Sequence, residues 1–225
     1  ALKYVNSKGV KQDYKRAVEL YTLSADQDHA QAQNNLGSMY EHGQGVEQDD
    51  KRAVKWYTLA AEQGYAIAQI NLGFMYENGQ GVEQDDKRAV EWYTLAAEQD
   101  YAMGQYNLGV MYARGQGVEQ DNKRAVKWYT LAAEQGDARA QSNLGVMYAN
   151  GKGVEQDNKR AVKLYTLAAE QGYARAQSNL GIMYAKGQGV DKSLTEAKEW
   201  WTKAAAQGDQ DSIVRLDHYK KYTSI

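Results

Sequence analysis

The sequence repeats itself every 36 residues, and this period limits the possible folds more than any other feature of the chain. The repeat is seen most easily at one leucine position, which recurs at Leu36, Leu72, Leu108, Leu144, Leu180 and Leu216. A fixed period of about 20 to 50 residues is typical of proteins that stack identical structural units. Because one such unit is too small to bury its own apolar side chains, neighbouring units must complete its core.

Each unit reads as two helices separated by a glycine-rich loop. In one complete copy, the first helix from Ala66 to Asn78 ends at Gly79, a residue type that readily adopts the left-handed backbone found after helices. Asp85 then precedes the second helix, where its carboxylate can accept hydrogen bonds from the first turn. The second helix is expected to end at Gln99. The sequence therefore predicts an all-α fold, a right-handed α-solenoid of antiparallel helix pairs.

The period also sets the expected boundaries within one repeat domain that covers residues 1–225. A truncated first unit is expected at residues 1–28 and a C-terminal capping helix at residues 209–225. The five full units between them are expected at residues 29–64, 65–100, 101–136, 137–172 and 173–208.

Two glycine positions carry structural predictions. One glycine recurs inside the first helix of every full unit, beginning with Gly37. Glycine inside a helix costs about 0.5–1 kcal/mol relative to alanine, so its recurrence predicts that a neighbouring helix approaches closely there. At the end of the second helix, Asp28 and Asp100 replace the usual glycine. Aspartate tolerates a left-handed backbone less well, and we expect these two helix ends to fray more easily.

The composition argues against several classes of function. A formal net charge of -2 provides no overall attraction to nucleic acid or to a membrane surface. No apolar run approaches the roughly 18–20 residues of a membrane-spanning helix, so we expect no membrane insertion. Cysteine is absent, which excludes disulfides and thiolate metal sites. The compartment stays open between the cytoplasm and, if an upstream signal has been removed, the periplasm or the exterior.

No motif predicts a metal site, a cofactor or a catalytic centre. His29 and His42 stand at opposite ends of one expected helix, about 20 Å apart, which is too far to share a metal ion. The acidic loop around Asp49 lacks the alternating oxygen ligands and central glycine of a calcium loop. The few serines form no nucleophile–histidine–acid set. Tryptophan recurs at one repeat position, which favours a place in the core over stacking on nucleic acid bases. The position holds Trp56, Trp92, Trp128 and Trp200.

The recurring phrases AQxNLGxMYxxGxGV, QDxxxAVKWY and LAAEQG resemble the signature of Sel1-like repeats, relatives of the tetratricopeptide repeat. The resemblance extends over nearly all of residues 1–208, although Glu47 and its copies stand where that family often has proline. It implies an α-solenoid that acts as an adaptor and holds other proteins. The family is mostly bacterial or eukaryotic, and some bacterial members are exported and meet host factors. A hydrolase activity has been proposed for some cysteine-rich relatives, and it remains an alternative.

The copies differ from one another at five positions of the first helix. At about 100° per residue, these positions share one arc of about 100°, away from the recurring Leu36 and Met39. By analogy with the tetratricopeptide fold, such an arc would line the inner groove of the solenoid. Because many side chains on the arc are apolar, we favour a partner-binding groove over an exposed face without a ligand.

The predicted groove has two parts. Its apolar floor consists of Ile67, Ile70, Phe74, Met103, Tyr106 and Val110. Its basic flank consists of Arg114, Arg139, Arg175 and Lys186. Together they suit a protein or peptide ligand with apolar anchors followed by acidic residues. The sequence therefore predicts a non-enzymatic protein- or peptide-binding scaffold. The alternatives are a hydrolase-type enzyme and a purely structural spacer that binds nothing in the groove.

Overall fold

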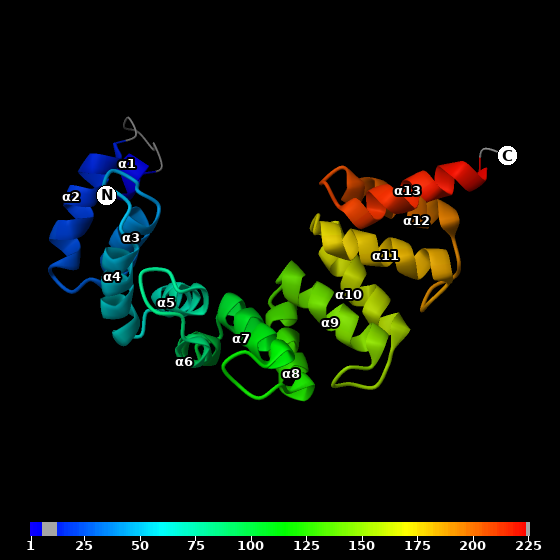
Figure 1. Ribbon diagram of the computed structural model, residues 1–225, viewed down its shortest axis with the longest axis horizontal. Helices are drawn as coiled ribbons and strands as arrows, with labels where there is room; N and C mark the ends of the chain where they lie inside the picture. The colour runs from blue at the N-terminus through cyan, green and yellow to red at the C-terminus, as the bar shows by residue number, and fades with distance from the viewer. Residues whose placement is uncertain (6–12, 224–225) are drawn as a thin grey trace. The chain divides into compact units, whose positions relative to one another are not determined.

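The chain folds into helices that are joined by short loops (Figure 1). A computed structural model describes residues 1–5 and 13–223, and these residues form thirteen helices and no strand. The helices are α1 (Leu2–Val5), α2 (Tyr14–Ala25), α3 (Ala30–Glu41), α4 (Asp50–Glu62), α5 (Ala66–Asn78), α6 (Asp86–Glu98), α7 (Ala102–Arg114), α8 (Asn122–Glu134), α9 (Ala138–Asn150), α10 (Asn158–Glu170), α11 (Ala174–Lys186), α12 (Leu194–Ala205) and α13 (Gln210–Thr223). Residues 6–12 of the expected truncated unit and residues 224–225 of the expected capping helix lie outside the described residues.

The predicted all-α repeat of 36 residues is confirmed. Helices α3, α5, α7, α9 and α11 are the first helices of the full units, and α4, α6, α8, α10 and α12 are the second helices. The chain divides into two compact units, residues 1–120 and residues 121–225. Within the first unit, consecutive helices from α2 to α7 pack against each other, and the same holds from α8 to α13 within the second unit (Figure 1).

The invariant apolar positions form the core between consecutive helices. In the first unit, one cluster joins Ala53 and Tyr57 of α4 with Leu72 and Met75 of α5. None of these four side chains is more than 1% exposed. The second helix of one unit and the first helix of the next therefore share a continuous core, as stacked repeats must.

The glycines inside α3, α5, α9 and α11 each make room for an aromatic ring. A methyl group added to Gly73 would lie 2.7 Å from the ring of Tyr93. In the second unit, a methyl group on Gly145 would lie 2.7 Å from the ring of Tyr165. The predicted close approach is confirmed, and the structure identifies the neighbour as a side chain of the second helix.

A buried glutamine on the first helix ties three helices together. The Nε2 of Gln69 in α5 donates to the carbonyl oxygen of Ala61 in α4 over 3.2 Å. Its Oε1 accepts from Nε2 of Gln99, the residue that follows α6, over 2.7 Å. Both ends of the buried amide thus have partners, as buried polar groups require. The same pair of bonds recurs at Gln33, Gln141 and Gln177.

The helix ends follow the predicted capping pattern. The Oδ1 of Asp85 accepts hydrogen bonds from the backbone N–H groups of Lys87 and Arg88, each over 3.1 Å. Gly79 has the left-handed backbone expected after α5, with a φ of 65°. Helix α6 ends at Glu98, one residue earlier than predicted, because Gln99 is its C-cap. The same aspartate cap begins α2, α4, α8 and α10, and Ser193 takes its place before α12.

Aspartate does occupy left-handed backbone at the two exceptional positions. Asp28 has a φ of 59° and Asp100 a φ of 66°. At Asp100 the side chain finds a local partner, since its Oδ1 accepts from Nε2 of Gln105 over 2.9 Å. Easier fraying at these two helix ends stays a prediction.

Candidate partner-binding surface

Three large apolar side chains of α5 and α7 are exposed in the first unit. Ile67 and Phe74 of α5 are 40% and 44% exposed, and Met103 of α7 is 48% exposed. Tyr106 and Val110 of α7 are half-buried. Helices α5 and α7 contact each other, and these five side chains are here named together the α5–α7 surface. Large apolar side chains that remain exposed next to one another are typical of an interaction site.

Ile70 does not belong to this surface, because it is only 5% exposed. The equivalent side chain Asn34 in α3 is also buried, and its Oδ1 accepts from Nδ2 of Asn71 in α5 over 3.0 Å. This position therefore faces the next first helix. Burial removes Ile70 from the predicted apolar floor and gives it a packing role between repeats.

A second variable position of the first helix serves the core in the first unit. The hydroxyl of Tyr93 in α6 donates to the carboxylate of Glu77 in α5 over 2.7 Å. Burial, followed by the hydrogen bond to Glu77, raises the pKa of the Tyr93 hydroxyl. The same bond joins Tyr57 to Glu41 over 2.5 Å. Glutamate at this position therefore accepts a hydrogen bond from a tyrosine of the same repeat.

In the second unit, the equivalent tyrosine, Tyr165, has no glutamate at this position. Ala149 takes the place of the glutamate, and burial raises the pKa of the Tyr165 hydroxyl to about 12. The positive charge of Arg175 in α11 acts on that pKa in the opposite direction. The residue at this variable position therefore determines whether the buried tyrosine hydroxyl has a carboxylate partner in the first helix.

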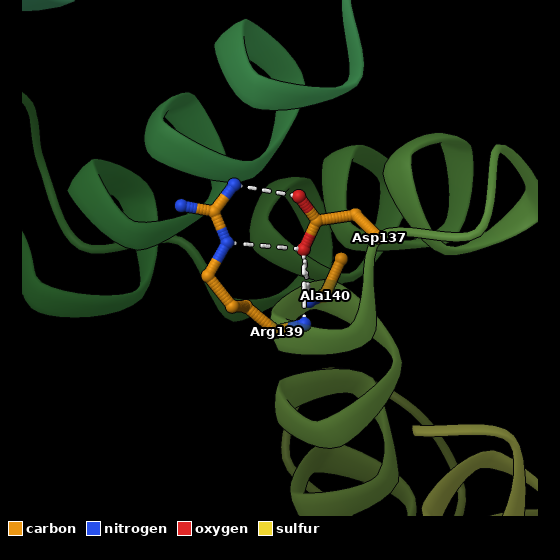
Figure 2. Close-up of polar contacts among 3 residues, drawn as sticks. All are labelled: Asp137, Arg139 and Ala140. Carbon is orange, nitrogen blue, oxygen red and sulfur yellow. Dashed lines mark hydrogen bonds and ion pairs between the residues drawn. The ribbon is translucent and has the colours of Figure 1, made fainter. Parts of the chain in front are cut away.

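Arg139 of α9 is held by an acid of its own helix (Figure 2). Its Nη2 lies 2.6 Å from Oδ2 of Asp137, and its Nε lies 3.3 Å from Oδ1. The same Oδ1 accepts from the backbone N–H groups of Arg139 and Ala140, so Asp137 also caps α9 (Figure 2). The side chain of Asp137 is 11% exposed and that of Arg139 is 37% exposed. The charge of Arg139 is therefore largely compensated, unlike that of a bare surface cation.

The other predicted basic residues are exposed. Arg175 lies in the first turn of α11 and Lys186 at the end of the same helix, about 16 Å apart along its axis. At the position of Asp137, α11 has Tyr173, which gives Arg175 no carboxylate from that position. Arg114 ends α7 in the first unit. The predicted basic flank thus comprises Arg114 in one unit and Arg139, Arg175 and Lys186 in the other.

The two histidines at the ends of α3 lie close to backbone carbonyl groups. The Nδ1 of His29 lies 3.1 Å from the carbonyl oxygen of Ser24, and the Nδ1 of His42 lies 2.9 Å from that of Ser38. Over residues 1–5 and 13–223, no group of three or more histidine, aspartate or glutamate side chains is placed to hold a metal ion. No helix in this part of the chain is long and apolar enough to span a membrane.

The repeat matches one family model along nearly the whole chain. The model of the Sel1 repeat matches residues 4–29, 30–65, 66–101, 102–137, 138–173 and 174–209. The chain belongs to the Sel1 repeat family. Sel1 repeats typically form scaffolds for protein interactions. The resemblance seen in the sequence motifs is therefore confirmed, and with it the solenoid fold class.

Solved Sel1 repeat structures are similar to this chain. The antigen c5321 of uropathogenic Escherichia coli strains, described as protective and as having an SLR fold, is 42% identical with a TM-score of 0.89. The match covers 98% of this chain and 47% of the antigen chain, so this chain spans about half of that protein. A Sel1 repeat protein from Oxalobacter formigenes is 37% identical with a TM-score of 0.88, over 96% of this chain and 85% of that one.

More distant structures share the fold alone. The immunity protein Pa5087 from Pseudomonas aeruginosa is 21% identical, with a TM-score of 0.54, and the match covers 88% of this chain and 76% of that one. No curated protein sequence matches the chain significantly. The family therefore gives a class of function, that of a scaffold for protein interactions.

Proposed function

We propose that the chain is a non-enzymatic scaffold that binds a protein or peptide along the exposed side of its first helices. The observation that carries this proposal is the exposure of Ile67, Phe74 and Met103 on two contacting helices. These residues stand where the copies differ, whereas the recurring positions beside them are buried. Membership of the Sel1 repeat family supports the proposal, because the family typically forms protein-interaction scaffolds.

The chemistry of the exposed side chains defines the expected partner. The α5–α7 surface favours a segment with two or three apolar anchors, since large apolar side chains carry most of the binding energy at such sites. Arg114 lies about 16 Å along α7 from Met103 and near the same face of the helix. An acidic side chain next to the apolar anchors would meet Arg114, and Arg175 and Lys186 offer similar charges in the second unit. That residues 1–225 act as one repeat domain stays a prediction.

The proposal is tested with peptides selected from a random displayed library on the wild-type chain. The affinity of the selected peptides is then measured by calorimetry for the wild type and for the Phe74→Ala/Met103→Ala variant. We expect affinity to fall at least about tenfold, because each truncation of a central anchor typically costs over 1 kcal/mol.

A matched control comes from exposed leucines on helices outside the α5–α7 surface. Leu23 of α2 is 63% exposed and Leu95 of α6 is 43% exposed. The Leu23→Ala/Leu95→Ala variant removes a comparable amount of exposed apolar side chain, and we expect it to bind the selected peptides like the wild type. Equal affinity of both variants, or a library that yields no binding peptide, would contradict the proposal and favour a structural spacer.

A further inference from the structure

A tryptophan of one second helix covers the core of the preceding helix pair. Trp56 of α4 packs against the core of α2 and α3, and Trp92 of α6 packs against the core of α4 and α5. In the second unit, Trp200 of α12 packs against the core of α10 and α11. A tyrosine of the first helix packs against the same core in each case. These tyrosines are Tyr40, Tyr76 and Tyr184.

Helix α10 departs from this pattern because it carries Leu164 at the tryptophan position. Leu164 lines an open pocket of about 550 Å³ over α8 and α9. Leu144 and Tyr148 of α9 line it as well, and they correspond to the leucine and tyrosine that lie near the indole in the other repeats. The pocket therefore stands where the neighbouring repeats hold an indole, and its volume falls within the range of ligand sites.

The rim of the pocket carries charge suited to an aromatic ring. Lys163 lines the pocket directly before Leu164. In α8, Lys127 precedes Trp128 in the same way, and its Nζ lies 5.6 Å from the centroid of the indole. A lysine over the face of an indole attracts it electrostatically. Glu134 lies on the α8 side of the pocket, so its rim offers both signs of charge to a polypeptide that crosses it.

We propose that this pocket binds a tryptophan side chain of a partner protein. The repeats themselves show that such a core accepts an indole presented by a polypeptide. A second copy of the chain is a poor donor, because all five of its tryptophans are buried or half-buried in their own repeats. The pocket shares no residue with the α5–α7 surface, so failure of partner binding at that surface would not refute tryptophan binding in the pocket.

The test follows the leucine methyl signals of the full chain by NMR as N-acetyl-L-tryptophanamide is added. Shifts are expected for Leu144, Leu164 and Leu167, with a Kd of about 0.1–1 mM for a ligand of this size. N-acetyl-L-leucinamide is the control ligand and should shift these signals at least about tenfold more weakly. Absence of shifts at these leucines with the tryptophan derivative would overturn the proposal.

Two variants separate binding at the pocket from binding elsewhere. Leu164→Trp fills the pocket with a residue that the chain already carries at four equivalent positions, so it should fold and lose at least about tenfold in affinity. Trp92→Leu should open a matched pocket in the first unit and add shifts at Leu72, a member of the core against which Trp92 packs. Unchanged affinity of Leu164→Trp, or no gain in a folded Trp92→Leu, would overturn the proposal. Self-association of the wild type that Leu164→Trp abolishes would identify a second copy as the occupant and overturn it as well.

Discussion

Helices α5 and α9 share one packing scheme and differ in what they expose. Both place a glycine against a buried tyrosine, Gly73 against Tyr93 in α5 and Gly145 against Tyr165 in α9. Both use a buried glutamine to bridge three helices. The exposed sides differ, because Ile67 and Phe74 in α5 correspond to Arg139 and Val146 in α9.

Stacking therefore constrains one side of each first helix, whereas the exposed side is free to differ between repeats. Side chains that touch the neighbouring repeats are constrained by close packing. Side chains on the exposed side can change at little cost to stability, since substitutions there usually shift it by less than about 0.5 kcal/mol. One scaffold can therefore present an apolar surface in one unit and arginine in the other.

The largest expected difference between α5 and α9 concerns Ile70 and its counterpart Ser142. Ile70→Ala should cost about 2–4 kcal/mol, because it leaves a cavity between first helices. Ser142 is also buried, but its hydroxyl has no hydrogen-bond partner among the described residues. Ser142→Ala should therefore be neutral or slightly stabilising. Urea unfolding followed by circular dichroism measures both, and a neutral Ile70→Ala would return Ile70 to the partner surface.

Replacement of the shared glycine by alanine should lower the stability by the same amount in α5 and in α9. Gly73→Ala and Gly145→Ala each push a methyl group into a tyrosine ring, and each should cost about 1–3 kcal/mol by overpacking. The same unfolding series measures both variants. Costs that differ by more than about 1 kcal/mol would show that the packing scheme is not shared.

Removal of the tyrosine hydroxyl should cost more stability at Tyr93 than at Tyr165. Tyr93→Phe removes the hydrogen bond to Glu77 and should cost about 1 kcal/mol. Tyr165→Phe should cost less than about 0.5 kcal/mol, because Ala149 stands in the glutamate position. A double-mutant cycle of Tyr93→Phe with Glu77→Ala isolates the interaction, and a coupling energy near zero would refute it.

Truncation of apolar side chains should cost least at the α5–α7 surface. Phe74→Ala/Met103→Ala removes two large side chains, each nearly half exposed, and should cost about 1 kcal/mol in total. This is less than the cost of Ile70→Ala alone. A loss above about 3 kcal/mol in the urea series would mean that the two residues belong to the core.

The repeat period predicted most of the fold, because the residue types that cap the helices and fill the core recur at the same positions in the copies. Aspartate caps four of the second helices, with Ser193 in its place before α12, and glycine follows α5 with a left-handed backbone as predicted. Variation between copies singled out Ile67, Phe74 and Met103, and all three are exposed, while their role in binding a partner stays a prediction.

The sequence could not separate the edges of the variable arc. A helical wheel resolves direction about one helix, whereas the burial of Ile70 depends on how the next first helix lies across it. The bond between Tyr93 and Glu77 depends instead on how α6 packs against α5, and the bridging role of Gln69 depends on the positions of α4 and α6. Leu164 was visible as an exception to the tryptophan position, but its pocket exists only once α8, α9 and α10 are packed.

The most direct test uses the absence of cysteine from the chain, since a single introduced thiol is then a unique reporter. Phe74→Cys, Met103→Cys and Ile70→Cys are each treated with a thiol reagent under native conditions, and the labelling rates are compared with those of the unfolded chains. The account predicts near-unfolded rates at positions 74 and 103 and a rate at least about tenfold slower at position 70, where labelling requires local opening. Slow labelling at positions 74 and 103 would contradict a partner-binding surface on α5 and α7.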